Sequence, residues 1–293
     1  MSGARFGGVL APIPTPFDVA TGEVAPVHLR HNAARLLAEG LDGLLIAGST
    51  GEAPLLDPDE QRRMTAWVRD VLPDGKMLFA GTGAESTRQT IALTRAAGAE
   101  GADAVLVRAP GYFGPMHSPA SLVDHFRAVA DASPIPVLLY NMPKYTHLPL
   151  AAGLLQQLAG HPNVVGAKDS SGDAKNLAAY RDAAPGWTVF VGSASLLYTG
   201  LELGCQGGVL AAACFAPRLC VDLLVAFQGG DRVRAGALQE RLTPLDKEIV
   251  GKFGPAGVKA AMDAAGYYGG PIRAPLAPVP AGDREHIARL LAA

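Results

Sequence analysis

The sequence is poor in the features that mark small disulfide-bonded or membrane-bound proteins. Only three of its 293 residues are cysteines. Cys205, Cys214 and Cys220 are odd in number and lie in apolar surroundings, which predicts buried, reduced thiols. No apolar run approaches the length that spans a bilayer. The first residues lack the apolar core of a signal segment, so we expect a cytoplasmic protein.

An excess of charge of either sign is also missing. The chain has 25 basic and 27 acidic residues, which gives a formal net charge of −2. Its lysines and arginines are scattered, whereas proteins that bind nucleic acid usually carry a clustered basic surface. We therefore expect neither nucleic acid nor a membrane as a partner.

Motifs for metals and nucleotides are absent as well. The seven histidines are dispersed, and the chain has no His-Glu-x-x-His motif and no Cys-x-x-Cys pair. His28 and His31 are three apart on an expected helix, where a solvated helix face explains them better than a metal does. No Gly-x-Gly-x-x-Gly follows the first expected strand. The sequence therefore predicts no metal site and no cofactor.

What the sequence has instead is a regular alternation of short, apolar, β-branched runs with amphipathic stretches. This alternation is typical of repeated strand–helix units around a parallel sheet. The expected strands are at 8–11, 43–47, 77–80, 103–107, 136–140, 164–168, 188–191 and 208–212. The expected helices between them are at 27–39, 58–71, 87–97, 120–130, 151–158, 177–182, 196–203 and 217–227. This pattern favours an α/β fold of the (β/α)₈ TIM-barrel type over an open, doubly wound sheet.

Helical patterns continue beyond the expected barrel, at 232–250, 255–266 and 284–292. We predict a barrel with the catalytic rim over residues 1–228, and a C-terminal helical extension of the same domain over residues 229–293. The proline-rich segment 271–280 is best explained as a short connector between two helices. Asp57, Ser86 and Ser118 are expected to cap helix N-termini.

Lys168 is the most informative residue of the chain. It ends the apolar run 164–167 and precedes a polar loop, 169–173. Lysines avoid burial unless they are paired or chemically useful, and removal from water favours the neutral amine, which condenses with ketones to a Schiff base. An ion pair with Asp169 or Asp173 is the alternative explanation of this residue.

Two other strand ends carry polar groups, and in a barrel such ends meet at one rim. After the second strand comes a cradle of two glycines, Gly48 and Gly51, around Ser49 and Thr50, followed by Glu52. Backbone N–H groups and hydroxyls in such a turn suit a carboxylate, although a tight turn alone also requires glycines. Tyr140 ends the fifth strand, and Tyr112 lies in the loop after the fourth strand. An amine, a phenol and a carboxylate cradle suggest imine chemistry on a 2-keto acid.

These residues resemble a known family. The segment 48–52, the Tyr-Asn-x-Pro motif at 140–143 and the Gly-x-Lys-Asp strand end at 166–169 are similar to those of the pyruvate-dependent class I aldolases. This superfamily includes dihydrodipicolinate synthase and N-acetylneuraminate lyase, and the resemblance covers essentially the whole chain. It implies a Schiff base between Lys168 and a 2-keto acid such as pyruvate, with an aldehyde as the other partner.

The resemblance also implies roles for other residues. Tyr140 would shuttle protons, and Ser49 and Thr50 would bind the substrate carboxylate together with Gly48. Tyr112 matches a tyrosine that in many relatives reaches across a subunit interface, which implies a homo-oligomer, usually a tetramer built from dimers. Three further residues at the ends of the seventh and eighth strands are candidates for lining the pocket, with simple packing as the equal alternative. They are Gly192, Ser193 and Leu210.

Fewer residues indicate to which branch of this family the chain is most similar. Tyr145 stands where the lysine-biosynthetic synthases carry an arginine that binds the second carboxylate, and the neighbouring Lys144 cannot supply the same planar clamp. The segments 80–87, 252–257 and 266–276 resemble the 4-hydroxy-2-oxoglutarate aldolases, although Thr50 stands where that branch often has Asn. We expect the tail segments to lie far from the rim.

Four functions therefore remain open. The favoured prediction is a retro-aldol lyase that splits a 4-hydroxy-2-keto acid, such as 4-hydroxy-2-oxoglutarate, into pyruvate and an aldehyde such as glyoxylate. The first alternative is dihydrodipicolinate synthase, which condenses pyruvate with aspartate semialdehyde. The second is a sugar-acid aldolase or dehydratase of the same superfamily. The third is a catalytically silent barrel that serves as a ligand-binding regulator.

Overall fold

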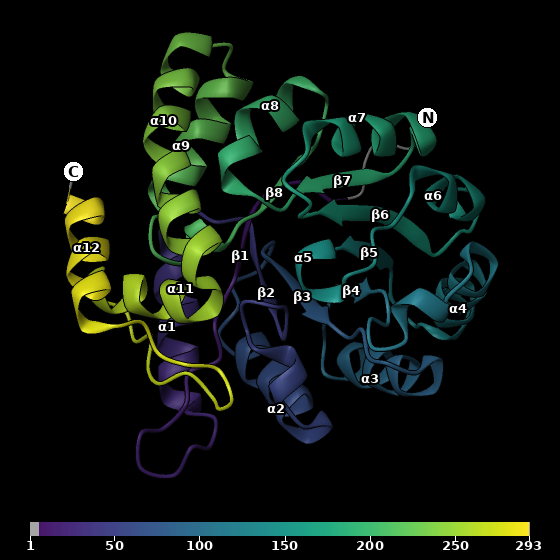
Figure 1. Ribbon diagram of the computed structural model, residues 1–293, viewed down its shortest axis with the longest axis horizontal. Helices are drawn as coiled ribbons and strands as arrows, with labels where there is room; N and C mark the ends of the chain where they lie inside the picture. Colours follow the sequence, from purple (N-terminus) through teal and green to yellow (C-terminus); the bar gives the residue numbers. More distant parts are fainter. Residues whose placement is uncertain (1–5, 293) are drawn as a thin grey trace.

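The computed structural model describes residues 6–292. The prediction that the chain lacks a signal segment rests partly on residues 1–5, which lie outside this range. Eight parallel strands close into a barrel in chain order, with β8 pairing with β1 (Figure 1). The strands are β1 (Gly8–Pro12), β2 (Gly43–Ile46), β3 (Met77–Gly81), β4 (Ala104–Arg108), β5 (Val137–Asn141), β6 (Val164–Asp169), β7 (Thr188–Val191) and β8 (Gly207–Val209). The predicted (β/α)₈ barrel is confirmed.

Helices connect the strands, and all of them except the short α5, which lies at the barrel mouth, cover the outside of the barrel (Figure 1). They are α1 (Pro26–Ala38), α2 (Pro58–Arg69), α3 (Thr87–Ala99), α4 (Pro119–Ala132), α5 (Pro143–Thr146), α6 (Ala152–Leu158), α7 (Ala174–Ala183), α8 (Leu197–Glu202) and α9 (Pro217–Gln228). The three predicted N-caps are confirmed, since the side chains of Asp57, Ser86 and Ser118 each accept a backbone N–H of the first turn. The one-turn helix α5 was not predicted, because four residues are too few to show a helical period.

Strand residues alternate between two apolar layers. The barrel interior is filled by side chains such as Leu45, Phe79 and Leu138. The alternate residues, such as Leu44 and Val105, pack outward against the helices. This alternation decides which residue at each strand end faces the barrel mouth, where the candidate site lies.

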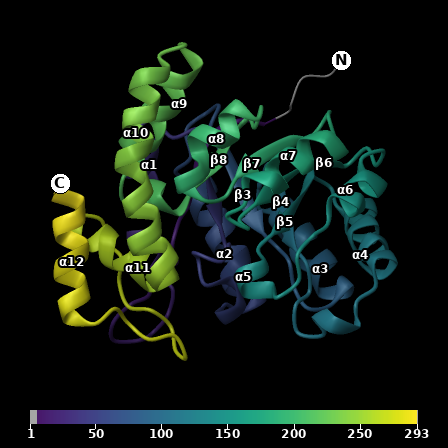
Figure 2. The same ribbon diagram turned by 45° about the horizontal axis from the view of Figure 1, so that its top comes forward.

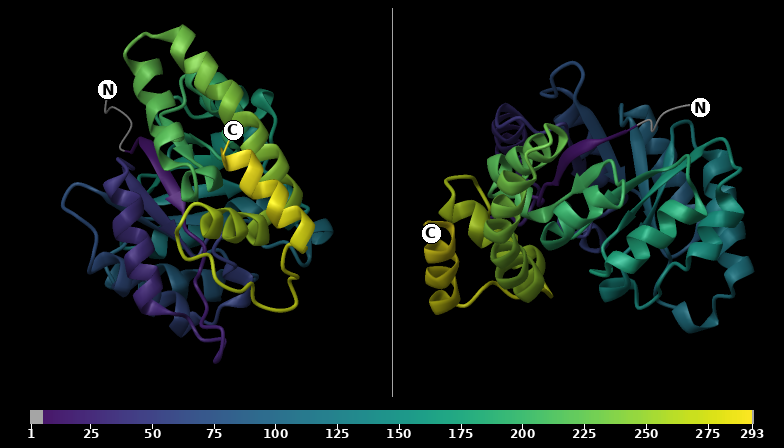
Figure 3. Two further views of the ribbon diagram at one scale, coloured as in Figure 1. Left: turned by 90° about the vertical axis from the view of Figure 1, so that its left-hand side faces the viewer. Right: turned by 90° about the horizontal axis from the view of Figure 1, so that it is seen from above.

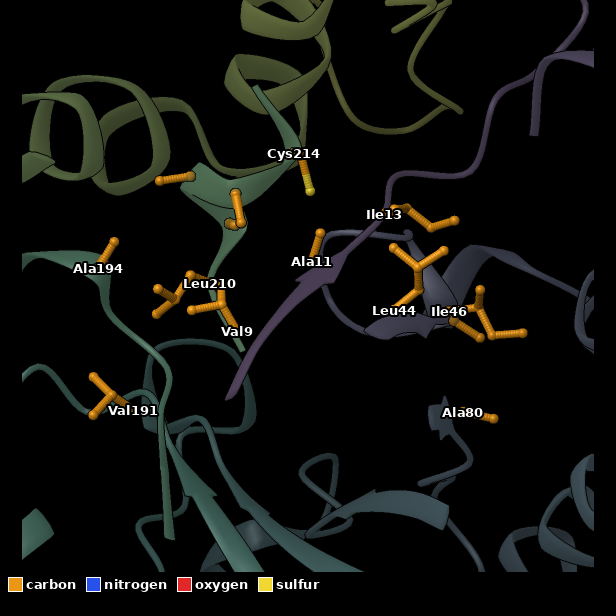
Figure 4. Packing of buried hydrophobic residues seen from close by; sticks show 14 of the residues in the cluster. Val9, Ala11, Ile13, Leu44, Ile46, Ala80, Val191, Ala194, Leu210 and Cys214 are labelled. Carbon is orange, nitrogen blue, oxygen red and sulfur yellow. The ribbon is translucent and has the colours of Figure 1, made fainter. Parts of the chain in front are cut away.

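The end of β8 differs from the prediction. The strand stops at Val209, and Ala211–Cys214 forms a 3-10 helix, η4. The Cys214 thiol donates to the carbonyl oxygen of Pro12 at 3.3 Å, and Leu210 packs near Val9 and Ala11 in the outer apolar layer (Figure 4). A run of small apolar residues is compatible with either conformation, so the sequence could not separate them.

The C-terminal residues form α10 (Arg232–Leu245), α11 (Lys252–Ala264) and α12 (Ala281–Ala292). A π-helical segment, η5 (Asp246–Gly251), joins α10 to α11, where the sequence predicted an α-helix to residue 250 and a break before residue 255. Figures 2 and 3 show α9 and α10 side by side at one flank of the barrel, with α11 and α12 next to them. Within residues 6–292, none of the helices has the length and apolar character needed to cross a membrane. The domain boundary at residues 228 and 229 stays a prediction.

Candidate active site

Lys168 lies at the carboxyl end of β6, and only 4% of its surface is exposed. None of the ion pairs formed within residues 6–292 includes Lys168. Asp173 caps α7 by accepting the N–H of Lys175. The ion pair with Asp169 or Asp173, considered from the sequence, is therefore not formed.

Asp169 is engaged in a different buried network. Its carboxylate accepts from the Asn141 amide at 2.6 Å and from the Ser171 hydroxyl at 2.7 Å. Burial raises the pKa of Asp169, and these hydrogen bonds only partly oppose that effect. The Asn141 oxygen also accepts the N–H of Leu150 at 3.0 Å. This network ties the ends of β5 and β6 together beneath the site.

Tyr140 is the neighbour of Lys168 in the barrel. Their Cα atoms are direct partners in the pairing of β5 and β6, and the Lys168 Nζ lies 4.6 Å from the centre of the Tyr140 ring. The Tyr140 hydroxyl lies 3.4 Å from the Ser49 Oγ. The structure thus joins the predicted amine, phenol and hydroxyl in one group.

A cavity of about 50 Å³ opens beside the Lys168 amine. Its walls include Ser49, Thr50, Tyr140 and Gly192. A Cβ atom at Gly192 would lie 2.9 Å from the Lys168 Cε and closer still to other atoms. A glycine is therefore needed at position 192, because any side chain there would displace the lysine.

Ser170 also lines this small cavity, and the sequence analysis did not single it out. Its Oγ is buried and has no hydrogen-bond partner among the described residues. Buried hydroxyls without a partner are unusual in folded proteins. Ser170 therefore offers an unused donor and acceptor next to Lys168.

A second cavity, of about 830 Å³, adjoins the small one and shares Ser49, Tyr140, Met142, Tyr145, Gly254 and Pro255 with it. Gly48 lines the large cavity, as do Glu85 and Arg108. A small compartment at the amine and a roomier one outside it can hold the two halves of a substrate that is cleaved between them.

The position of the tail corrects one expectation. Lys252, Phe253 and Leu276 line the large cavity, and Val258 lines the small one. The segments that we expected to lie far from the rim therefore form part of its wall. The π-helical segment η5 shifts the start of α11, and Gly254 adopts φ 57° and ψ −138°, a conformation that favours glycine. These two irregularities could not be read from helical periodicity.

Tyr145 stands between the two cavities. Its hydroxyl lies against Gly254, where a Cβ atom would come within 2.8 Å of it. Burial raises the pKa of this phenol, and Tyr140 adds to the effect. Tyr145 therefore offers a neutral phenol at the position where, by the resemblance described above, the lysine-biosynthetic synthases carry an arginine.

Three predicted residues lie away from the small cavity. Leu210 is fully buried in the outer apolar layer, and its neighbour Ala211 lines the cavity instead. The Ser193 hydroxyl donates to Asp246 at 2.7 Å. Tyr112 is 79% exposed at the edge of the large cavity, where its ring packs on Phe113.

Glu52 ends the cradle but turns away from it. Its side chain is buried and forms an ion pair with Lys259 of α11, and it accepts the N–H of Arg273 at 2.8 Å. Desolvation lowers the pKa of Lys259, while Glu52 opposes the shift. This buried pair anchors the cradle to the C-terminal extension.

No group of three or more histidine, cysteine or acidic side chains within residues 6–292 is arranged to hold a metal ion. The groups beside the small cavity include an amine, a phenol and hydroxyls. Such groups can form an imine and move protons.

Comparison with known proteins agrees with this geometry. Residues 5–293 match the model of the dihydrodipicolinate synthetase family. An uncharacterised DapA-like lyase of Halobacterium salinarum is 40% identical over 280 residues, covering 94% of this chain and 90% of the relative. A 4-hydroxy-tetrahydrodipicolinate synthase of Synechococcus sp. CC9311 is 37% identical and covers 100% and 97% of the two chains.

Solved structures give the same result. YagE of E. coli K12, a prophage protein of the dihydrodipicolinic acid synthase family in complex with pyruvate, superposes with a TM-score of 0.92 at 29% identity. The match covers 99% of this chain and 98% of YagE. Dihydrodipicolinate synthase DapA-2 of Bacillus anthracis superposes with a TM-score of 0.93 at 27% identity, with 99% of each chain covered.

Proposed function

The chain belongs to the dihydrodipicolinate synthetase family, and we propose that within it the protein is a lyase that cleaves a 4-hydroxy-2-keto acid to pyruvate and an aldehyde. A suitable substrate is 4-hydroxy-2-oxoglutarate, which would give glyoxylate. The observation that carries the proposal is the buried Lys168 amine without a carboxylate partner, beside Tyr140 and a small cavity.

The first step is the formation of the imine. The substrate carboxylate lies against Ser49 and Thr50, which places its keto carbon at Lys168. The amine attacks this carbon, and the keto oxygen leaves as water with one proton from the amine and one from the Tyr140 hydroxyl. A protonated imine and a Tyr140 phenolate remain. Ser170 can donate a hydrogen bond to the departing oxygen, because its hydroxyl has no other partner.

The second step breaks the bond between C3 and C4. The Tyr140 phenolate left by the first step accepts the proton of the C4 hydroxyl, while Ser49, 3.4 Å away, keeps its hydrogen bond to the Tyr140 oxygen. The electron pair of the breaking bond moves between C2 and C3, the imine nitrogen takes the imine π electrons, and the aldehyde leaves into the large cavity. Protonation of C3 and hydrolysis of the imine release pyruvate and restore the amine.

Tyr112 extends the proposal to the quaternary structure. In the segment after β4, the side chains of three residues are largely exposed: Tyr112, Phe113 and Met116. We assign this apolar group to a contact with a second copy of the chain, in which Tyr112 would continue the proton relay from Tyr140. A homo-oligomer built from such dimers is the expected assembly.

The test is a pyruvate-release assay on 4-hydroxy-2-oxoglutarate with the wild-type protein and Lys168→Ala. We expect turnover in the wild type and none in the variant, because the imine cannot form without the amine. Absence of release by the wild type would reject this substrate. Equal release by both proteins would reject the mechanism.

The second candidate is 4-hydroxy-tetrahydrodipicolinate synthase. The names of the cyanobacterial relatives, at 35–37% identity, favour it. Tyr145 argues against it, because a phenol cannot form the bidentate clamp on a carboxylate that an arginine forms. Condensation of pyruvate with aspartate semialdehyde, assayed with the same preparation, separates the two reactions.

A further inference from the structure

Arg108 is the last residue of β4, and it points into the mouth of the barrel. Ala104 and Leu106 of the same strand belong to the apolar interior, while Val105 and Val107 belong to the outer layer. Because side chains alternate along a strand, Arg108 continues the interior row. Its guanidinium lines the large cavity.

Arg108 also lies level with the residues of the proposed mechanism. Its Cα atom is the direct partner of Tyr140 in the pairing of β4 and β5, and Tyr140 is the partner of Lys168 in the next pair. Two strand spacings separate the backbones of Arg108 and Lys168, which is about 10 Å. The two long side chains can therefore reach the opposite ends of one short substrate.

A local clamp fixes the guanidinium. Its Nη1 atom donates to the Ala109 carbonyl at 3.0 Å and pairs with Glu85 at 2.8 Å. The second Glu85 oxygen accepts the N–H of Tyr112 at 2.8 Å. Burial would raise the pKa of Glu85, but the N–H of Tyr112 and the Arg108 guanidinium lower it below its ordinary value, so the clamp stays ionised.

Gly83 makes room for this arrangement. A Cβ atom at position 83 would lie 2.5 Å from the Arg108 Cγ and 2.6 Å from its backbone nitrogen. Any side chain at Gly83 would therefore push Arg108 out of place. This gives a physical reason for the Gly-Ala-Glu sequence at 83–85, which lies within a segment that the sequence analysis singled out.

The guanidinium still has capacity for a ligand. Within the described part of the chain, its hydrogen bond and its ion pair both use Nη1, and no protein partner of Nε or Nη2 is found. Lys144 and Lys252 also line the cavity and also have partners, the Gly251 carbonyl and Asp283, but an ammonium lacks the planar fork of donors that a guanidinium offers. Arg108 is thus the cation best placed for a planar anion in this cavity.

From this geometry we propose that Arg108 binds a carboxylate on the aldehyde half of the substrate. The proposal rests on the proposed function and narrows it to dicarboxylic 4-hydroxy-2-keto acids. Arg108 would approach this carboxylate from the end of β4, and not from the position that Tyr145 occupies after β5. A substrate with a neutral tail would leave the guanidinium without its anion and bind less tightly.

The test uses borohydride trapping on Lys168 with two five-carbon keto acids that differ only at the far end. These are 2-oxoglutarate, which has a distal carboxylate, and 2-oxopentanoate, which has a methyl group there. Pyruvate trapping in each protein serves as the reference. We expect the wild type to trap 2-oxoglutarate at lower concentrations than 2-oxopentanoate, and Arg108→Gln to reduce this preference by about 10- to 100-fold.

Two further variants complete the design. Arg108→Lys keeps the charge but loses the planar fork, so we expect an intermediate preference, and it supplies the same comparison if the glutamine variant does not fold. Arg30→Gln is the matched control: it removes a guanidinium of α1 that pairs with Asp70 and lines neither cavity, and we expect the wild-type preference.

The outcomes separate the two proposals. If pyruvate leaves no adduct on Lys168 of the wild type, the proposed function fails and the role of Arg108 fails with it. If pyruvate is trapped but 2-oxoglutarate has no advantage, or Arg108→Gln keeps the advantage, only the role of Arg108 is overturned.

Discussion

Lys168 is a buried amine that lies over the Tyr140 ring and forms no ion pair with a carboxylate of the described residues. The two acidic residues that follow it in the sequence are used elsewhere, Asp169 by Asn141 and Ser171, and Asp173 by the start of α7. A lysine held only to stabilise the fold would gain more from an ion pair. The arrangement is therefore better suited to covalent chemistry than to structure.

Tyr140→Phe tests the proton transfer assigned to this group. The ring is kept, so packing against Lys168 is retained, but the hydroxyl that faces Ser49 is lost. We expect kcat for pyruvate release to fall by about 10²- to 10⁴-fold. Tyr198→Phe, in a ring that packs on Phe227, is the control and should keep wild-type turnover. Turnover of Tyr140→Phe within twofold of the wild type would contradict the assigned role.

The central site residues could be predicted because they follow strands. Lys168 and Tyr140 were identified because they are polar residues at the ends of apolar strands, and their Cα atoms are direct partners in the pairing of β5 and β6. The sequence analysis did not identify Arg108. Its role depends on which residues of β4 face the barrel interior and on the space that Gly83 leaves beside it. The positions of Ser170 and Gly254 in the cavity wall depend on irregular backbone conformations, which no periodic sequence pattern predicts.

The link between the β2 loop and helix α11 is the buried pair of Glu52 and Lys259. Lys259 also donates to the Pro271 carbonyl at 2.6 Å, and its Nζ lies 4.4 Å from the centre of the Phe17 ring. Its side chain is 3% exposed and that of Glu52 is fully buried. The cradle at 48–52 is therefore held from behind by the C-terminal extension.

Lys259→Met tests this link. It leaves the Glu52 carboxylate buried without its cation, so we expect a loss of about 3–5 kcal/mol in the free energy of unfolding, measured in urea. The matched control is Lys252→Met on the same helix, which breaks an exposed pair with Asp283 and should cost less than about 1 kcal/mol. Equal losses in the two variants would show that the buried pair does not stabilise the fold.

Regular elements were easier to predict than the joints between them. Hydroxyl and carboxyl caps mark α2, α3 and α4, and a hydrogen-bonded capping box at Asp57 and Glu60 fixes the start of α2. The π-helical η5, the short α5 and the early end of β8 were missed. Each of them is set by packing of the tail against the barrel or by a few residues, so the local pattern carries no signal for it.

The molecule as a whole is a barrel whose mouth is partly walled by its own C-terminal helices. Gly254, Pro255 and Val258 of α11 line the small cavity opposite the strands that carry the chemistry. The C-terminal extension is therefore part of the candidate active site. A truncation that removed it would open both cavities as well as remove Lys259.

The stability of the folded protein is expected to depend on pH through His125. This residue is buried between α3 and α4, its Nδ1 lies 2.9 Å from the Thr87 hydroxyl, and burial lowers its pKa to about 4 from an ordinary 6.5, with His117 and Arg108 adding to the effect. Between these values the unfolded chain binds more protons than the folded one. The contribution of His125 to stability therefore falls as the pH drops from about 6.5 to about 4, by at most about 3 to 4 kcal/mol.

His125→Gln checks this dependence. The variant should lose less stability than the wild type between pH 7 and pH 4, as measured by urea unfolding at each pH. His31→Gln, at an exposed position of α1, should keep the wild-type slope. Parallel pH profiles for His125→Gln and the wild type would contradict the prediction.

The most direct test of the Schiff-base chemistry at Lys168 is borohydride trapping with pyruvate, followed by peptide mass spectrometry of the wild-type protein and of Lys168→Arg. We predict one reduced pyruvyl adduct, located on the peptide that contains Lys168, and none in the variant. Adducts on other lysines, or no adduct on the wild type, would contradict the assignment of Lys168 as the amine that forms the Schiff base.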